Sequence, residues 1–168
     1  MDAFLFLVVV EILGLAAWPL AKRLFSDFPD KGWAFSKTMG IFFVAWVVWI
    51  LSSLKILPYS TIGSYVITII VAFLVWGCCL GFNRSAFAEE LSNVNSLFRG
   101  KDKNPFAFRV EIIFLAIFML WNEVRSYNPQ LQDLEKFMDY GFMLSSMKTE
   151  YFPPLDHFFS REPINYYY

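Results

Sequence analysis

Three long apolar runs dominate this sequence and strongly limit what it can fold into. They cover residues 3–20, 38–54 and 61–82, and the single charged residue inside them is Glu11. A helix needs about 20 consecutive apolar residues to cross the hydrocarbon core of a bilayer. The runs therefore predict three membrane-spanning helices. Because no basic residue precedes the first run, we expect it to be a retained helix rather than a secretory signal peptide.

A fourth apolar run predicts one more spanning helix, although charges interrupt it. Only residues 112–122 are free of charge, and Arg109 and Glu111 are expected near the headgroups, where long side chains can reach the interface. The polar stretch 83–105 that precedes this run is expected to be partly helical. The four predicted helices and the loop that follows them cover approximately residues 3–24, 38–55, 61–82, 106–124 and 125–168.

The composition agrees with an all-α, polytopic integral membrane protein. Hydrophobic residues make up 57% of the chain and charged residues only 17%, against about 45–50% and 25% in soluble domains. The formal net charge of −1 provides no basic field for nucleic acid, so the lipid bilayer is the expected partner. A single histidine and two adjacent cysteines, Cys78 and Cys79, do not match zinc-ligand spacings. We expect both thiols to pack as small residues inside the membrane.

The distribution of lysine and arginine predicts the orientation. With four spans and an external N-terminus, nine of the 14 basic residues fall in the first and third loops, on the cytoplasmic side. Cytoplasmic loops are enriched in these residues. We therefore expect a multi-pass protein of the cell membrane whose N-terminus and residues 125–168 are extracytoplasmic. If the fourth run does not span, the orientation of residues 125–168 is reversed.

The segment "DLEKFMDYGFM" predicts an amphipathic helix in the last loop. Asp133 can cap a helix that starts near Leu134, because its carboxylate accepts hydrogen bonds from free backbone N–H groups. Glu135 and Asp139 are four residues apart and share one face. The apolar residues of the opposite face are Leu134, Phe137, Met138, Gly141 and Leu144. Such a helix can lie in the membrane interface with its acids directed away from lipid.

Two carboxylates on one helix face have more than one interpretation. Their mutual repulsion can turn one of them into a general base, or together they can hold a divalent cation. Alternatively, Glu135 and Asp139 belong to an ordinary solvated face. The spacing alone favours this last interpretation, because acids four residues apart are common on surface helices.

Glu11 is the other acid with a candidate role, since it lies in the middle of the first run. An ionisable residue inside a membrane helix is by default a functional hypothesis. The alternative, which we favour, is an interhelical hydrogen bond between Glu11 and a polar group of another helix.

Aromatic residues lie near the ends of the proposed spans. Tryptophan and tyrosine are enriched at the two surfaces of a bilayer, where one edge of the ring meets water. We expect such a belt from Trp18, Trp33, Tyr59 and Trp121.

Several stretches together resemble a known family. They are "FPDKGWAFSKTMG" after the first run, the pattern "EKFMD…YFPP…INYYY" in the last loop, and the tyrosine triplet itself. Over essentially its whole length the chain resembles the YYY membrane-protein family, named for its Tyr-Tyr-Tyr motif. Members of that family carry further membrane helices after the triplet. The resemblance therefore implies that these residues form the N-terminal portion of a longer polytopic protein.

The layout of that family is similar to the GT-C class of membrane glycosyltransferases, which take sugar from a polyprenyl-phosphate donor. GT-C enzymes carry an essential acid in an extracytoplasmic loop shortly after a membrane helix. The resemblance implies that Glu135 or Asp139 is the general base, although the adjacent Asp-Glu pair usual in GT-C enzymes is absent here. The candidate substrate-binding residues are Arg125, His157, Arg161, Tyr166 and Tyr167. The alternative is a non-catalytic membrane protein, such as a scaffold or part of a transporter.

Overall fold

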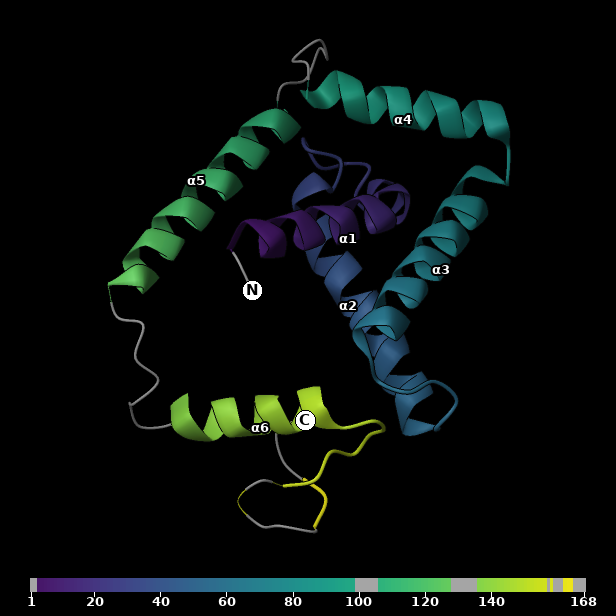
Figure 1. The fold of residues 1–168 in the computed structure, drawn as a ribbon. Coiled ribbons are helices and arrows are strands. Elements are labelled where there is room, and N and C mark those ends of the chain that lie inside the picture. The colour runs from purple at the N-terminus through teal and green to yellow at the C-terminus, as the bar shows by residue number, and fades with distance from the viewer. Residues whose placement is uncertain (1–2, 99–105, 128–135, 157, 159–161, 165–168) are drawn as a thin grey trace. The chain divides into compact units, whose positions relative to one another are not determined.

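The structure is a computed structural model that describes residues 3–98, 106–127, 136–156, 158 and 162–164. Within these residues it contains six α helices and no strand, which confirms the all-α class (Figure 1). The helices are α1 (Ala3–Leu24), α2 (Trp33–Ser53), α3 (Thr61–Leu80), α4 (Arg84–Phe98), α5 (Phe106–Ser126) and α6 (Lys136–Lys148). One isolated antiparallel bridge joins Leu155 to Pro163.

Three of these helices, α1, α2 and α3, are long and apolar enough to cross a membrane. They correspond to the first three predicted spans. The helix α5 has a similar length but does not belong to this group, because its sequence carries the charged residues Arg109, Glu111, Glu123 and Arg125. A membrane crossing by α5 therefore stays a prediction, as does the orientation that depends on it.

The start of α2 differs from the prediction. The helix begins at Trp33, five residues earlier than expected, because the carboxylate of Asp30 accepts hydrogen bonds from the backbone N–H groups of Gly32 at 3.1 Å and Ala34 at 2.9 Å. Gly32 has a φ of 81°, a conformation that glycine adopts without strain. Lys37 consequently lies inside the helix and is buried, so its assignment to the first loop was wrong.

The described residues divide into two compact units, which we describe separately. Unit 1 comprises residues 1–44 and 68–124, and unit 2 comprises residues 45–67 and 125–168. Unit 1 therefore holds α1, α4 and most of α5, together with the first part of α2 and the last part of α3. Unit 2 holds α6, the remaining parts of α2 and α3, and the link between those two helices.

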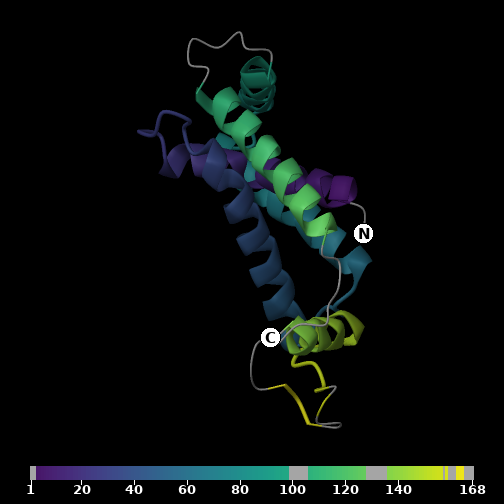
Figure 2. The ribbon, with the colours of Figure 1, turned by 90° about the vertical axis from the view of Figure 1, so that its left-hand side faces the viewer.

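The core of unit 1 forms where helices distant in sequence meet. It consists of Trp18, Trp33, Val94 and Ala107, contributed by α1, α2, α4 and α5. The two indole rings pack edge to face, with centroids 5.0 Å apart. Both tryptophans are only 2% exposed, so their placement in an aromatic belt at the membrane surface was wrong. The helix α1 crosses α5 (Figure 2), and there the ring of Phe6 stacks on that of Phe118.

The helices α1 and α2 approach each other closely enough for their backbones to touch. A Cβ atom added to Gly40 would lie 2.0 Å from the carbonyl oxygen of Leu13, and one added to Gly14 would lie 2.9 Å from Cγ of Lys37. Glycines allow such close contact between membrane helices, where dispersion forces drive association. The crossing brings Lys37 of α2 beside α1.

In unit 2, the chain after α6 folds back and contacts the link between α2 and α3. The backbone N–H of Tyr59 donates to the carbonyl of Glu150 at 2.7 Å, and the rings of Tyr59 and Phe152 pack 5.1 Å apart. The ring of Phe158 packs against Phe137 and Phe142 of α6. Within this unit, these contacts hold α6 against the turn that joins α2 to α3.

Candidate functional site

The helix α6 presents the one candidate base that the structure describes. Asp139 lies in the first turn of α6, and its side chain is exposed. Arg125 is exposed in the last turn of α5. The other predicted site residues, Glu135, His157, Arg161, Tyr166 and Tyr167, lie outside the described residues. Among the residues that are described, no group of three histidine, cysteine or acidic side chains could hold a metal ion.

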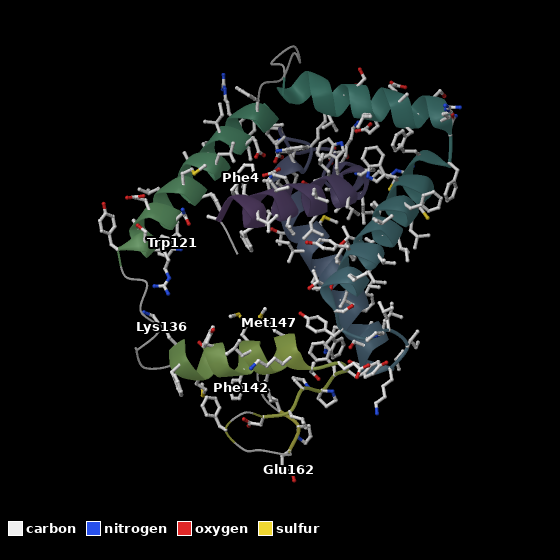
Figure 3. All side chains as sticks on the ribbon, in the orientation of Figure 1. Phe4, Trp121, Lys136, Phe142, Met147 and Glu162 are labelled. Atoms are coloured by element: carbon white, nitrogen blue, oxygen red, sulfur yellow. The ribbon has the colours of Figure 1, made fainter. Side chains whose placement is uncertain are left out.

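The face of α6 that carries Asp139 is not wholly polar. Met143 and Met147 follow Asp139 at intervals of four residues, so the three side chains share one face. Both methionines are more than half exposed. Phe142 and Met147 point to different sides of α6 (Figure 3). The predicted separation into one acidic and one apolar face therefore does not describe this helix, which exposes apolar side chains beside its acid.

The most heavily charged cluster of unit 1 lies in its interior and centres on Lys37. The ammonium of Lys37 donates to Oε2 of Glu11 at 2.7 Å and to Oε2 of Glu111 at 2.9 Å. Trp33 donates its indole N–H to the same oxygen of Glu111 at 2.6 Å. The ammonium also lies about 5 Å from the ring centroids of Trp33 and Phe114, a distance at which a cation is attracted by an aromatic face. We call Glu11, Lys37 and Glu111 the buried triad, in which Lys37 and Glu111 are buried and Glu11 is half-buried.

A second ion pair connects α1 to α4. Lys22 donates to both carboxylate oxygens of Glu90, at 2.8 and 2.6 Å, and the indole N–H of Trp18 donates to Glu90 at 2.8 Å. Glu90 is 7% exposed. The two tryptophans of the core thus each satisfy a buried carboxylate. Together the two clusters connect α1 to α2, α4 and α5.

The buried triad has the chemistry of a structural clamp more than of a reactive site. Charges are stable away from water only when paired and hydrogen-bonded. Here one ammonium is shared by two carboxylates, and Oε1 of Glu11 is buried without a hydrogen-bond partner among the described residues. The favoured alternative for Glu11, a polar contact with another helix, is confirmed, although the partner is a charged lysine. The sequence indicated Glu11 by its place inside an apolar run. It missed the other two members, because Lys37 was taken as the boundary of its run and Glu111, which is buried, was expected near the headgroups.

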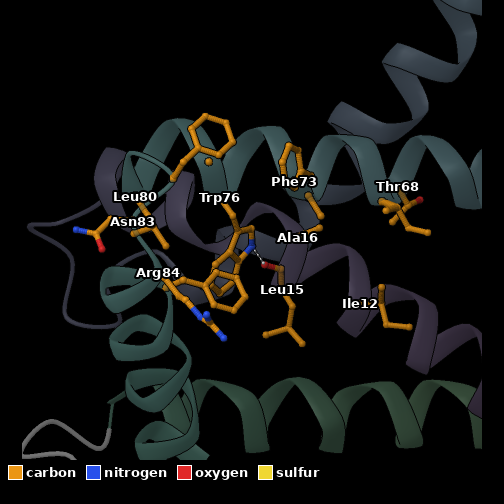
Figure 4. A pocket seen from close by; sticks show the side chains of 14 residues that line it. Ile12, Leu15, Ala16, Thr68, Phe73, Trp76, Leu80, Asn83 and Arg84 are labelled. Atoms are coloured by element: carbon orange, nitrogen blue, oxygen red, sulfur yellow. Dashed lines mark hydrogen bonds between the residues drawn. The ribbon is translucent and has the colours of Figure 1, made fainter.

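An apolar groove opens on the surface of unit 1 between α1 and α3, with the start of α4 at one end (Figure 4). Its volume is about 520 Å³, within the usual range of ligand sites. One hydrogen bond crosses its floor, from the indole N–H of Trp76 to the carbonyl of Leu15 at 3.1 Å. The polar side chains of Asn83 and Arg84 lie at one end of the groove, and Thr68 lies at the other.

Three helices are long and apolar enough to cross a membrane, and ion pairs join helices to one another inside unit 1. These are the features of a helical membrane protein. The chain belongs to the DUF2298 family of uncharacterized membrane proteins, whose model matches residues 43–168. No curated protein and no solved structure matches the chain. The family match confirms the expectation of a membrane protein. The match covers the second half of α2 and everything after it, including α6 and the tyrosine triplet.

Proposed function

We propose that the chain is the N-terminal part of a membrane glycosyltransferase of the GT-C type, which takes its sugar from a polyprenyl-phosphate donor. The observation that supports this proposal is the contrast between an exposed acid of unit 2 and three acids of unit 1 that pair with lysines. Glu11, Glu111 and Glu90 are held by lysines in unit 1. Asp139 is exposed on α6, in the segment that follows α5. An acid that a substrate can reach therefore lies in the segment where a GT-C enzyme carries its base.

The proposed reaction is a direct displacement at the anomeric carbon of the sugar. The carboxylate of Glu135 or Asp139 removes the proton of the acceptor hydroxyl as its oxygen forms a bond to that carbon. The bond from the carbon to the phosphate oxygen breaks, and its electron pair leaves with the polyprenyl phosphate. Arginine binds phosphate in a planar, two-pronged geometry, a role we assign to Arg125 or Arg161.

The remaining candidate residues complete the proposed substrate site. His157, Tyr166 and Tyr167 carry ring systems and hydrogen-bonding groups suited to a sugar. A divalent cation beside Glu135 and Asp139 would offset the charge of the leaving phosphate. The donor must be lipid-linked if residues 125–168 are extracytoplasmic, because nucleotide sugars remain in the cytoplasm.

The proposal requires that the segment before α6 lies outside the cell. A single cysteine introduced as Gln132→Cys is expected to react with a membrane-impermeant thiol reagent in intact cells. A Lys101→Cys variant should react only after the cells are opened, because the loop between α4 and α5 then lies inside. The chain without an added cysteine controls for Cys78 and Cys79. Labelling of Lys101→Cys in intact cells, with protection of Gln132→Cys, would reverse the orientation and remove the proposed site from the donor's side.

The direct test of the function is a transfer assay with the complete protein in membranes. Polyprenyl-phosphate sugar labelled in the sugar is supplied, and the label is followed into the water-soluble or lipid-linked product. We expect label in the product together with an equal amount of free polyprenyl phosphate. We expect no transfer from residues 1–168 alone. If the complete protein consumes none of the common polyprenyl-phosphate sugars, the proposal is contradicted.

A second candidate function is ion transport, and one observation favours it. Oε1 of Glu11 is buried with no hydrogen-bond partner among the described residues, and Glu11 lies mid-way along a spanning helix. An acid in that position can take part in a path for cations. If the protein transports ions, Glu11→Gln should abolish cation uptake into vesicles. If it is a glycosyltransferase, the same substitution should leave sugar transfer unchanged.

A further inference from the structure

We propose that the groove between α1 and α3 binds one acyl chain of an anionic phospholipid, whose phosphate contacts Arg84. The surroundings of the groove identify the kind of occupant. Both helices that form its walls are apolar enough to span a membrane. In a bilayer, such a groove opens onto lipid rather than water, so lipid acyl chains are the molecules available to fill it.

The lining of the groove suits an apolar chain along nearly its whole length. Most of the lining side chains are aliphatic or aromatic, and several of them are exposed. The exposed apolar residues are Ile12, Ile69, Phe73, Phe82 and Phe87. The indole N–H of Trp76, a polar group inside the groove, is already satisfied by Leu15. An acyl chain would cover this apolar surface without leaving a polar group unpaired.

The polar end of the groove is positively charged. Arg84 lies four residues after the last residue of α3 and begins α4, at the level where a spanning helix ends. Its side chain is exposed and points toward the groove (Figure 4). The first turn of α4 contains no acid. Arg23 adds a second positive charge nearby, because its guanidinium donates to the carbonyl of Cys79 in the last turn of α3.

These charges distinguish an anionic lipid from the other occupants. A headgroup phosphate can form charge-assisted hydrogen bonds with the guanidinium of Arg84. The amide oxygen of Asn83 caps α4 by accepting from the backbone N–H of Ser85 at 3.0 Å, so only the NH2 group of Asn83 could donate to the phosphate. A helix from another protein would fill the apolar part but would leave the guanidinium of Arg84 without an anion. Arg84 also falls in the loop predicted to face the cytoplasm, the side where anionic lipids attract basic residues.

The proposal can be tested with native mass spectrometry of the purified protein in mixed micelles. The micelles contain equal amounts of phosphatidylglycerol and phosphatidylcholine with the same acyl chains, and the lipid that stays bound is identified by mass. We expect the unmodified protein to retain one phosphatidylglycerol in preference to phosphatidylcholine. Arg84→Ala should lower the retained phosphatidylglycerol by about fivefold, the effect typical of one basic residue at a membrane surface.

Matched variants distinguish lipid binding in the groove from non-specific binding to any exposed charge or apolar surface. Arg109→Ala removes an exposed arginine of α5 away from the groove, and it should leave retention unchanged. Ala72→Phe fills the groove and should abolish retention of either lipid, whereas Ala116→Phe on the exposed side of α5 should not. Circular dichroism and thermal unfolding check the fold of each variant. Because Ala72 is half-buried, Ile69→Trp, at a largely exposed lining position, is the second obstructing variant.

Several outcomes would overturn the proposal. Equal retention of the two lipids, or equal losses in Arg84→Ala and Arg109→Ala, would show that Arg84 does not recognise the phosphate. Retention in both folded obstructing variants would show that the acyl chain lies elsewhere. A protein that carries no lipid but forms dimers, and loses them in Ala72→Phe, would identify a second copy as the occupant.

Discussion

Glu135→Gln in the complete protein is expected to slow sugar transfer by about 10²–10⁴-fold, the usual loss when a general base is removed. Glutamine keeps the size and hydrogen-bonding capacity of the side chain but cannot accept the proton of the acceptor hydroxyl. We expect Glu135 to face solvent, and replacement of a surface acid seldom alters stability by more than about 0.5 kcal/mol, so the abundance of the protein should change little. The product glycan is measured at matched protein levels.

The neighbouring acids provide the controls for this experiment. Asp139→Asn should have an effect of the same size or smaller, and the larger effect of the two variants identifies the base. Glu150→Gln removes an exposed acid of the same loop to which we assign no role. If all three variants make the product at the unmodified rate, the acids of this segment are a solvated face and the catalytic assignment is wrong.

Lys37→Met is expected to destabilise the protein by about 3–5 kcal/mol, the usual cost of leaving a buried charge without its partner. Lys37 is 6% exposed and Glu111 is 5% exposed. Without the ammonium, two carboxylates face each other inside the helix bundle, and the indole N–H of Trp33 satisfies only one oxygen. Equilibrium unfolding in mixed detergent micelles measures the change, with Lys148→Met, which removes an exposed lysine of α6, as the matched control.

Neutralising the whole buried triad separates lost pairing from lost packing. In the triple variant Glu11→Gln, Lys37→Met and Glu111→Gln, no unpaired charge remains, so most of the lost stability should return. If Lys37→Met is as stable as Lys148→Met, the ion pairs contribute nothing and the helices are held by apolar contacts alone. A triple variant as unstable as Lys37→Met would instead assign the effect to the shape of the lysine side chain.

Apolar run length predicted the three helices that are long and apolar enough to cross a membrane, because it measures a property that lipid selects. The predicted limits of α1 coincide with those observed, and α3 ends two residues before its predicted limit. The start of α2 was placed too late, because Lys37 was taken as the polar boundary of the run. Lys37 lies inside α2 where acids from two other helices reach it. That information is tertiary and cannot be read from the run itself.

The candidate site was predicted in part. The exposure of Asp139 was predicted, because the acids of this segment were expected to point away from lipid, and Asp139 is exposed in the structure. The same four-residue spacing also placed Met143 and Met147 on that face, so their position could have been predicted. The inward orientation of Trp18 and Trp33 could not, because it depends on Glu90 and Glu111, which lie 72 and 78 residues further along the chain.

The buried triad also sets an order of events during synthesis. The chain is made from its N-terminus, so α1 is available before α2 enters the bilayer. Glu11 precedes Lys37 by only 26 residues and can neutralise its ammonium as soon as the two helices meet. Glu111 is made 74 residues after Lys37 and completes the arrangement last. Until α5 has been made, Glu11 is therefore the one acid of the buried triad that can pair with the lysine, and the arrival of α5 adds the second carboxylate.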